Sequence, residues 1–99
     1  MHVVTRSRLV SFWRRHSDAE HPLRVWYRLT SRAQWRHFVQ LREAFPAADQ
    51  VGRLVVFNVG GNKYRLIAFV DYISRIVFIR NVLTHADYLR GGWKDDQWF

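Results

Sequence analysis

The sequence contains no cysteine, and this absence removes several kinds of chemistry at once. Disulfide cross-links, a thiolate nucleophile and a zinc site built on cysteine are all excluded. Apolar runs long enough to cross a membrane are also missing, and the first residues lack the apolar segment of a signal peptide. We therefore expect a soluble, cytoplasmic protein that does not act at a membrane.

Acidic residues are scarce as well. The 99 residues contain 8 Asp and Glu against 16 Lys and Arg, a formal net charge of +8, and all the basic residues except Lys63 and Lys94 are arginine. Residues 1–42 hold nine basic and two acidic residues, whereas residues 43–99 hold seven and six. Because arginine forms paired hydrogen bonds with phosphate, this surplus favours a polyanionic partner, with nucleic acid ahead of a membrane surface. A generally basic, soluble surface is the alternative.

The first half of the chain spaces its apolar residues as helices do. A short β-branched segment predicts a strand over residues 1–5, and the spacing that follows predicts helices over residues 7–16 and 17–32. Residues 31–34, SRAQ, have the spacing of a capping box, which predicts a third and shorter helix that Pro46 ends.

The second half changes to the period of strands. After a predicted loop over residues 46–52, three β-rich runs cover residues 53–59, 63–70 and 75–83. Short turns join them, which predicts an antiparallel meander. Helices packed on one face of a small, mostly antiparallel twisted sheet make an α+β fold, and the length favours a single domain over residues 1–99.

The chain closes with a predicted helical turn over residues 85–90 and a tail over residues 91–99. Trp93, Trp98 and Phe99 make this tail too apolar to extend into water. We expect it to fold back onto the domain or to meet a partner, and its role stays open.

The meander places several chemically active side chains at one end of the predicted sheet. Lys63 and Arg65 lie in line with apolar core positions at the start of the second run. Arg80 interrupts an apolar face on the third run. His85 and Tyr88 are three residues apart and so share a helical surface. Neighbouring antiparallel strands bring the start of one and the end of the next together, so these groups are expected to converge: Lys63, Arg65, Arg80, His85 and Tyr88.

This set suits RNA cleavage by the RNA's own 2′-hydroxyl. That reaction needs a base, an acid and fixed positive charge on the phosphate. His85 and Tyr88 can move protons, and Lys63 can act as a base if neighbouring arginines depress its pKa. Arg65 and Arg80 are suited to clamp the phosphate.

Neither a metal nor another cofactor is predicted. The nearest carboxylates, Asp71 and Asp87, do not form the cluster that a two-metal nuclease uses. A simpler interpretation also exists for the basic pair, because Lys63 and Arg65 can serve as an exposed strand end that prevents edge pairing. Taken singly each signal is weak, and together they favour a phosphate site.

Three long segments carry a resemblance to a known family. These segments are WYRLTSRAQW, VFNVGGNKYRLIAFVDY and VFIRNVLTHADY, joined by the shorter PAADQVG, within a likeness that runs from Met1 to about Tyr88. They resemble the HigB toxins of type II toxin–antitoxin systems, in the RelE-like superfamily. The resemblance implies a β-α-α-β-β-β fold and a ribosome-dependent mRNA endonuclease that needs no metal. It also implies a HigA-type helix-turn-helix antitoxin, through which DNA would be contacted only indirectly.

The resemblance assigns the predicted convergent set, Lys63, Arg65, Arg80, His85 and Tyr88, to RNA contact and catalysis. Asn62, just before the set, and the helix arginines Arg14, Arg15 and Arg28 are expected to bind RNA or the ribosome. Two other classes stay open: a non-catalytic module that binds RNA or the ribosome, and a basic domain that docks an acidic protein partner.

Overall fold

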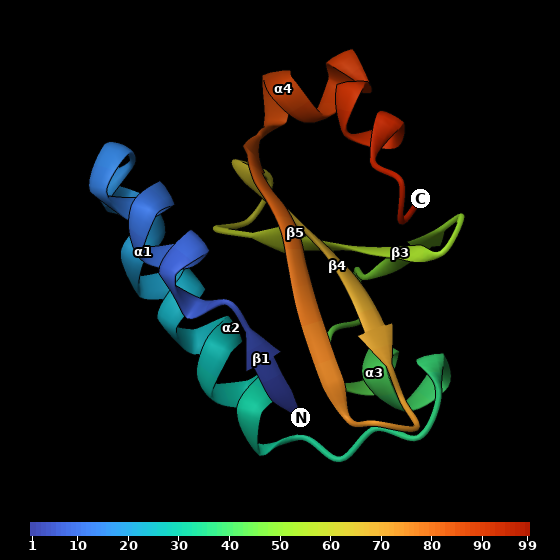
Figure 1. Cartoon of the computed structure of the whole chain (residues 1–99). Helices are drawn as coiled ribbons and strands as arrows, with labels where there is room; N and C mark the ends of the chain where they lie inside the picture. The colour runs from blue at the N-terminus through green and yellow to red at the C-terminus, as the bar shows by residue number, and fades with distance from the viewer.

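An antiparallel meander forms the centre of the molecule, and a short strand is added at each of its edges (Figure 1). The computed structural model describes all residues, 1–99. Its elements are β1 (His2–Val4), α1 (Arg6–Arg15), η1 (Ser17–Ala19), α2 (Glu20–Arg32), α3 (Phe38–Ala44), β2 (Asp49–Val51), β3 (Leu54–Val59), β4 (Tyr64–Asp71), β5 (Ile76–Thr84), α4 (His85–Arg90) and η2 (Gly92–Asp95). The strand order is β1-β5-β4-β3-β2, with β1 parallel to β5 and the other pairs antiparallel. The predicted α+β class is confirmed.

Two local predictions were wrong. The predicted loop over residues 46–52 contains β2, which pairs with β3; its three residues are too few to show a strand period. The predicted capping box does not form either, because Ser31 still belongs to α2 and its hydroxyl donates a hydrogen bond back to the carbonyl of Tyr27. A serine that bonds four residues back continues a helix instead of starting one, and α3 begins only at Phe38.

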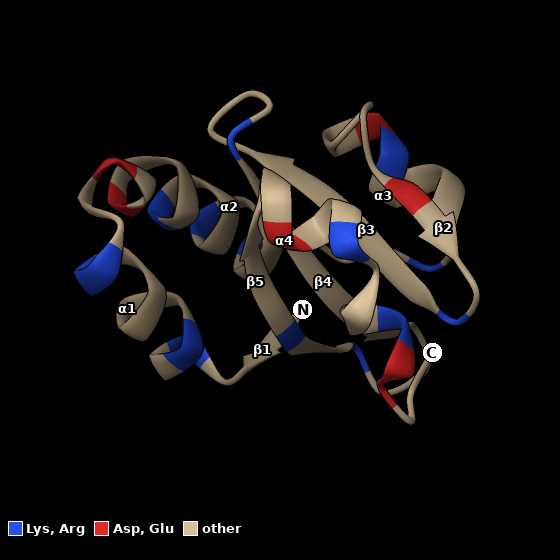
Figure 2. Ribbon diagram, turned by 90° about the horizontal axis from the view of Figure 1, so that it is seen from above, with Lys and Arg blue, Asp and Glu red and all other residues tan.

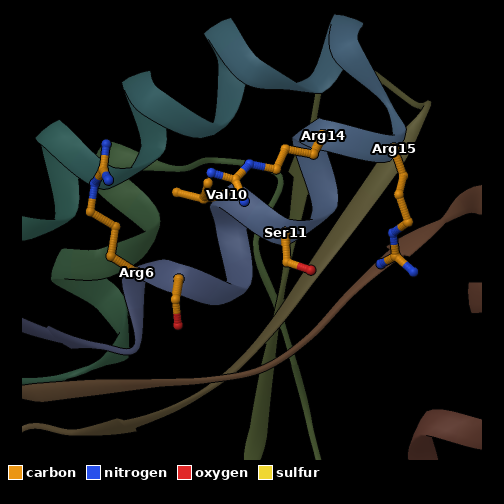
Figure 3. Close-up of a pocket in the computed structure, with 6 residues that line it drawn as sticks. Arg6, Val10, Ser11, Arg14 and Arg15 are labelled. Carbon is orange, nitrogen blue, oxygen red and sulfur yellow. The ribbon is translucent and has the colours of Figure 1, made fainter.

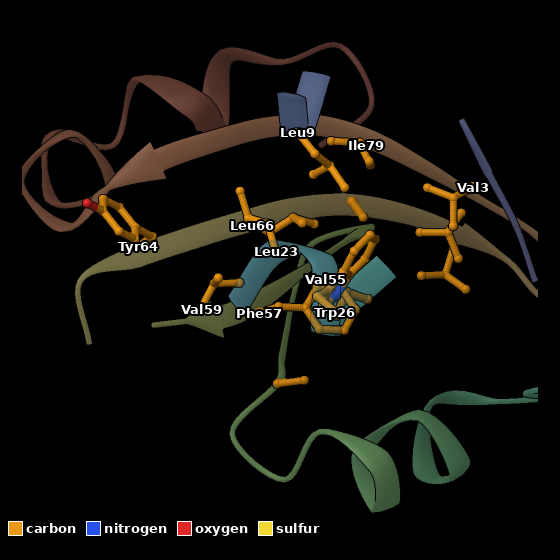
Figure 4. Packing of buried hydrophobic residues seen from close by; sticks show 14 of the residues in the cluster. Val3, Leu9, Leu23, Trp26, Val55, Phe57, Val59, Tyr64, Leu66 and Ile79 are labelled. Atoms are coloured by element: carbon orange, nitrogen blue, oxygen red, sulfur yellow. The ribbon is translucent and has the colours of Figure 1, made fainter. Parts of the chain in front are cut away.

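The main core lies between one face of the sheet and helices α1, α2 and α3 (Figure 4). Alternate residues of β4, among them Leu66 and Ala68, face these helices and are fully buried. From α2, Trp26 packs edge-on against Phe57 of β3, with ring centroids 5.4 Å apart. These three helices therefore cover one face of the sheet, as the sequence predicts. None of them is long and apolar enough to cross a membrane.

The opposite face of the sheet is covered by α4 and the C-terminal tail. A smaller cluster forms there around Val56, Ile67 and the buried Trp93, with Trp98 and Phe99 packed against it. The tail thus folds back onto the sheet, one of the two outcomes expected for it.

The turn between β2 and β3 also holds the tail in place. The backbone N–H of Arg53 donates to the carbonyl of Phe99 at 2.8 Å. Gly52 has a φ of +59°, and a Cβ at this position would lie 2.7 Å from that carbonyl oxygen. Only glycine fits here, because a side chain would both strain the backbone and push the tail away.

A β-bulge in β5 decides where one predicted site residue points. Ile67 of β4 pairs with Asn81 and Ala68 pairs with Ile79, so Arg80 is an extra residue without a partner in the register. After the bulge the alternation is shifted, and Val82 packs toward the helices. The bulge therefore separates Arg80 from Val82, which the strict alternation assumed for the third run would place on the same face.

Candidate functional site

Arg65 is the centre of the candidate site, on the face of the sheet that α4 covers. It is only 7% exposed, and its Nη1 and Nη2 groups donate to the carbonyls of Asn62 and Tyr64 and to Oδ1 of Asn62, at 3.0 to 3.2 Å. No carboxylate lies within ion-pair distance of it. These bonds leave its Nε–H and one Nη2–H without a protein acceptor. A buried guanidinium with no counter-charge is suited to bind an anion.

Two further predicted residues lie at the same end of the sheet. The guanidinium of Arg65 lies over the ring of Tyr88, 5.3 Å from its centroid. Thr84, which caps α4, pairs with Tyr64 in the sheet, so α4 begins next to the first residue of β4. His85 is the first residue of α4 and is exposed. The structure therefore brings Arg65 into contact with Tyr88 and places His85 at the same end of the sheet.

Lys63 joins this group through its backbone and not through its side chain. Its carbonyl accepts a hydrogen bond from the N–H of His85 at 2.9 Å. Its Nζ, however, lies 2.7 Å from Oδ2 of Asp18 in η1, and Asp18 also accepts from the hydroxyl of Tyr64. Because β4 begins only at Tyr64, Lys63 lies in the turn before the strand. The prediction that Lys63 and Arg65 lie in line on one face of a strand was therefore wrong.

The hydrogen bond to Asp18 and the attraction of its charge raise the pKa of Lys63 above its usual value. The prediction that neighbouring arginines depress this pKa was therefore wrong. Asp18 was not recognised as a partner, since it is distant in sequence and no local pattern links it to Lys63.

Arg80 is separate from this group. In the register Arg65 lies opposite Leu83, so Arg80 is three residues farther along β5, about 10 Å away at ~3.3 Å per residue. Its guanidinium makes two hydrogen bonds to Asp96, at 3.0 and 3.1 Å, and lies 4.2 Å from the ring centroid of Trp98. Asp96 of the tail thus neutralises the charge of Arg80. The Nη1 group of Arg80 has no hydrogen-bond acceptor in the protein.

The residues that sequence reasoning missed belong mostly to the tail. Trp93 stacks on Tyr88, with ring centroids 5.3 Å apart and an angle of 12° between the planes, and its Nε1 donates to the carbonyl of Tyr88 at 3.1 Å. Asp96 and Trp98 hold Arg80. The aromatic composition of the tail signalled that it would pack somewhere, but nothing in the sequence indicated which side chains it would touch.

Asp96→Asn is expected to loosen the tail in a pH-dependent way. Burial alone would raise the pKa of Asp96, but the hydrogen bonds from Arg80 and from the backbone of Trp98 outweigh it and lower the pKa below its ordinary 3.8. The stabilisation is therefore present above that ordinary pKa and is lost as pH falls through the folded-state pKa. At pH 7 the variant should lose about 1–3 kcal/mol of unfolding free energy, as for a hydrogen bond to a charged group.

Urea unfolding followed by tryptophan fluorescence at neutral pH, and again at the lowest pH where the protein stays folded, checks this. The difference between wild type and Asp96→Asn should shrink in acid. Asp95→Asn, which changes an exposed neighbour that forms no ion pair, is the matched control and should behave as wild type. A difference that is the same at both pH values would contradict the assigned role of Asp96.

A second basic region lies on α1 and α2 (Figure 2). These helices pack on the face of the sheet opposite to the one that holds Arg65. Arg14 and Arg15 line a pocket of about 680 Å³ along α1, together with Arg6, Ser7, Val10 and Ser11 (Figure 3). Arg28 is exposed on α2. None of Arg14, Arg15 and Arg28 has an acidic partner within ion-pair distance. Asn62, by contrast, is engaged in holding Arg65.

Metal ligands are not gathered anywhere in the structure: no group of three or more His, Cys, Asp or Glu side chains is placed to hold an ion. With its mostly antiparallel sheet, its helical layer and a buried arginine without a carboxylate partner at one end of the sheet, the molecule has the architecture of a RelE-like domain.

Comparison with known sequences agrees with this class. The profile of the HigB toxin family, described as the RelE-like toxic component of a toxin–antitoxin system, matches residues 19–90. The mRNA interferase toxin HigB of Escherichia coli strain K12 is 30% identical over 91 residues, which cover 89% of this chain and 88% of that protein. The mRNA interferase HigB of Escherichia coli O6:H1 strain CFT073 is 25% identical with the same coverage. This chain therefore belongs to the HigB toxin family, and it follows that it has an antitoxin partner. The tail over residues 91–99 lies outside the matched segment.

Proposed function

We propose that this protein is an mRNA interferase that cleaves mRNA on the ribosome and is neutralised by a HigA-type helix-turn-helix antitoxin. Residues 1–99 would act as one toxin domain in the cytoplasm, with DNA contacted only through the antitoxin. The names of the relatives support the substrate. The single observation that carries the proposal is Arg65, a buried guanidinium without a carboxylate, held over the ring of Tyr88.

The proposed reaction uses the 2′-hydroxyl of the RNA as nucleophile. It attacks the adjacent phosphorus, the bond to the 5′-oxygen breaks, and the products are a 2′,3′-cyclic phosphate and a 5′-hydroxyl. One proton leaves the 2′-hydroxyl and one reaches the 5′-oxygen. His85 and Tyr88 are the groups proposed to move them, and Arg65 is proposed to stabilise the charge that develops on the phosphate.

The remaining predicted residues take supporting roles in this proposal. Lys63, whose charged form Asp18 stabilises, would contribute positive charge and not a base. Asn62 would position Arg65, because its side-chain oxygen accepts from the guanidinium at 3.0 Å. Arg80 would offer its free Nη1 group to a neighbouring phosphate. Arginines of α1 and α2 would supply attraction to ribosomal RNA.

Induction in cells, followed by mapping of mRNA 5′ ends, tests the function. We expect growth arrest, new 5′ ends within translated regions, and rescue by co-expression of the antitoxin encoded beside the toxin. Arrest without new 5′ ends would instead favour a module that binds RNA without cutting it. Neither arrest nor cleavage would favour a protein-interaction domain.

Cleavage is expected to persist in excess chelator. Arg65 provides fixed charge on the phosphate, so the proposed chemistry does not draw on a bound ion. The assay uses purified protein and ribosomes stabilised with a polyamine, with ribosome integrity verified by sedimentation after chelation. Loss of cleavage on intact ribosomes, restored by adding back one transition metal, would overturn metal independence.

A further inference from the structure

A second pocket lies on the face of the sheet that holds Arg65, beyond Arg80. It has a volume of about 500 Å³, within the usual range for ligand sites, and is lined by Arg53, Phe69, Gln97 and Trp98. The tail contributes half of this lining, β4 contributes one residue, and the turn before β3 contributes the other.

The lining combines flat aromatic surface with unpaired polar groups. The rings of Phe69 and Trp98 meet edge to face, with centroids 5.4 Å apart, and both residues are half-buried. The side-chain amide of Gln97 has no hydrogen-bond partner, because only its backbone carbonyl is used, by Nη2 of Arg53. Arg53 has no acidic partner. An aromatic wall beside a free amide and a guanidinium suits a planar, hydrogen-bonding group attached to a phosphate.

The position of the pocket relative to Arg65 narrows the choice of ligand. Arg65 and Phe69 lie on one face of β4, four residues and therefore about 13 Å apart. Arg80 lies on the same face and touches Trp98. Two guanidinium groups without a carboxylate partner, those of Arg65 and Arg53, thus lie at the two ends of this strip, and Arg80 between them keeps a free Nη1 donor. This arrangement suits the backbone of a nucleic acid strand.

We infer that the pocket of Arg53, Phe69, Gln97 and Trp98 binds an unpaired nucleobase of the RNA strand whose phosphate lies at Arg65. The inference rests on the proposed function, since it takes RNA as the ligand at Arg65. The tail that supplies Gln97 and Trp98 lies outside the segment matched by the family profile, residues 19–90. A side chain of the antitoxin is the competing occupant, and the charge along the strip favours RNA over it.

Binding of short single-stranded RNA to the full chain tests the inference. The probes are fluorescein-labelled RNA tetranucleotides with a 2′-deoxy residue at the cleavage position, each compared with an abasic oligonucleotide of the same length. Base stacking on an aromatic side chain predicts that Trp98→Ala weakens binding of the base-bearing probe about tenfold and leaves the abasic probe unchanged. Trp98→Phe should retain most of the affinity, and Gln97→Leu should alter the preference among the four bases.

Two controls keep this result separate from the proposed function. Val39→Ala, an exposed apolar residue of α3, should bind both probes as wild type does. Arg65→Ala should weaken both probes equally, because it removes a phosphate contact. If Trp98→Ala binds both probes normally, or weakens both alike, the nucleobase subsite is wrong even where the wild type cleaves mRNA on ribosomes. Loss of antitoxin binding with unchanged RNA binding would assign the pocket to the antitoxin instead.

Discussion

Replacing Arg65 by alanine is expected to lower mRNA cleavage on ribosomes by about 10²- to 10³-fold, the usual effect of removing one preorganised group from a developing oxyanion. Arg65 is the only strongly buried charged residue of the chain, and its charge is not cancelled by a carboxylate. Its effect on a phosphate is therefore larger than that of an exposed arginine, which water screens.

The fold is expected to survive this change. All the hydrogen bonds of the Arg65 side chain go to the adjacent turn, at Asn62 and Tyr64, and none of them joins distant elements. Circular dichroism and thermal unfolding measure this directly. Single-turnover cleavage at saturating ribosomes then isolates the chemical step from binding.

Arg90→Ala is the matched control, because Arg90 is exposed on α4 and pairs only with Asp87. Arg65→Lys is the informative second variant: it keeps the charge but loses the forked donors, and we expect partial activity. Wild-type cleavage by a folded Arg65→Ala protein would remove Arg65 from the proposed mechanism.

A test of Arg80, which is proposed to contact a neighbouring phosphate, needs a different design. Removing Arg80 leaves the partly buried Asp96 without its partner, which by itself destabilises the tail. The double change Arg80→Ala with Asp96→Ala avoids this stranded charge. Loss of cleavage by the double variant, against normal cleavage by Asp96→Ala alone, would support a role for Arg80 in binding phosphate.

Local patterns were sufficient to predict most of the fold. The apolar spacing of α1 and α2 and the alternation of β3, β4 and β5 are each set within a few residues, so the sequence shows them directly. The strand β2 was missed because its pairing with β3 is decided across a turn and not by its own three residues. Antiparallel pairing places the start of β4 beside the end of β5. This was sufficient to predict that Arg65 lies close to the start of α4.

What the sequence did not reveal are contacts between residues far apart in the chain. The ion pair of Lys63 with Asp18 joins a turn to η1, and that of Arg80 with Asp96 joins a bulge to the tail. Both ion pairs form only once the helices and the tail have docked, so no spacing within a single segment predicts them. The bulge itself is an extra residue that ordinary alternation does not signal.

The arginines of the helical layer lead to the second large expected effect. Changing Arg14, Arg15 and Arg28 together to alanine should weaken ribosome binding strongly at physiological salt. By counterion release, each lost phosphate contact removes about 0.7–0.9 from the slope of log affinity against log salt, so the triple variant should lose about 2–3 units. Cleavage measured at saturating protein should change little, since these residues lie away from Arg65.

The control is a second triple variant with the same change of charge, Arg32→Ala, Arg36→Ala and Arg42→Ala, all of them exposed around the end of α2 and α3. If non-specific charge alone governs binding, both triple variants lose the same slope. If the pocket along α1 makes the contacts, the first triple variant loses far more.

The competing interpretation is that the surface of α1 and α2 chiefly binds the antitoxin. It predicts an unchanged salt slope for the variant of Arg14, Arg15 and Arg28, together with failure of the antitoxin to neutralise it. Measuring the salt slope and the neutralisation by antitoxin on one preparation separates the two interpretations. Attraction to RNA depends on the number of unpaired charges, whereas a protein interface also depends on apolar contacts such as those of Val10 in the pocket along α1. A changed slope with normal neutralisation would assign this surface to the ribosome.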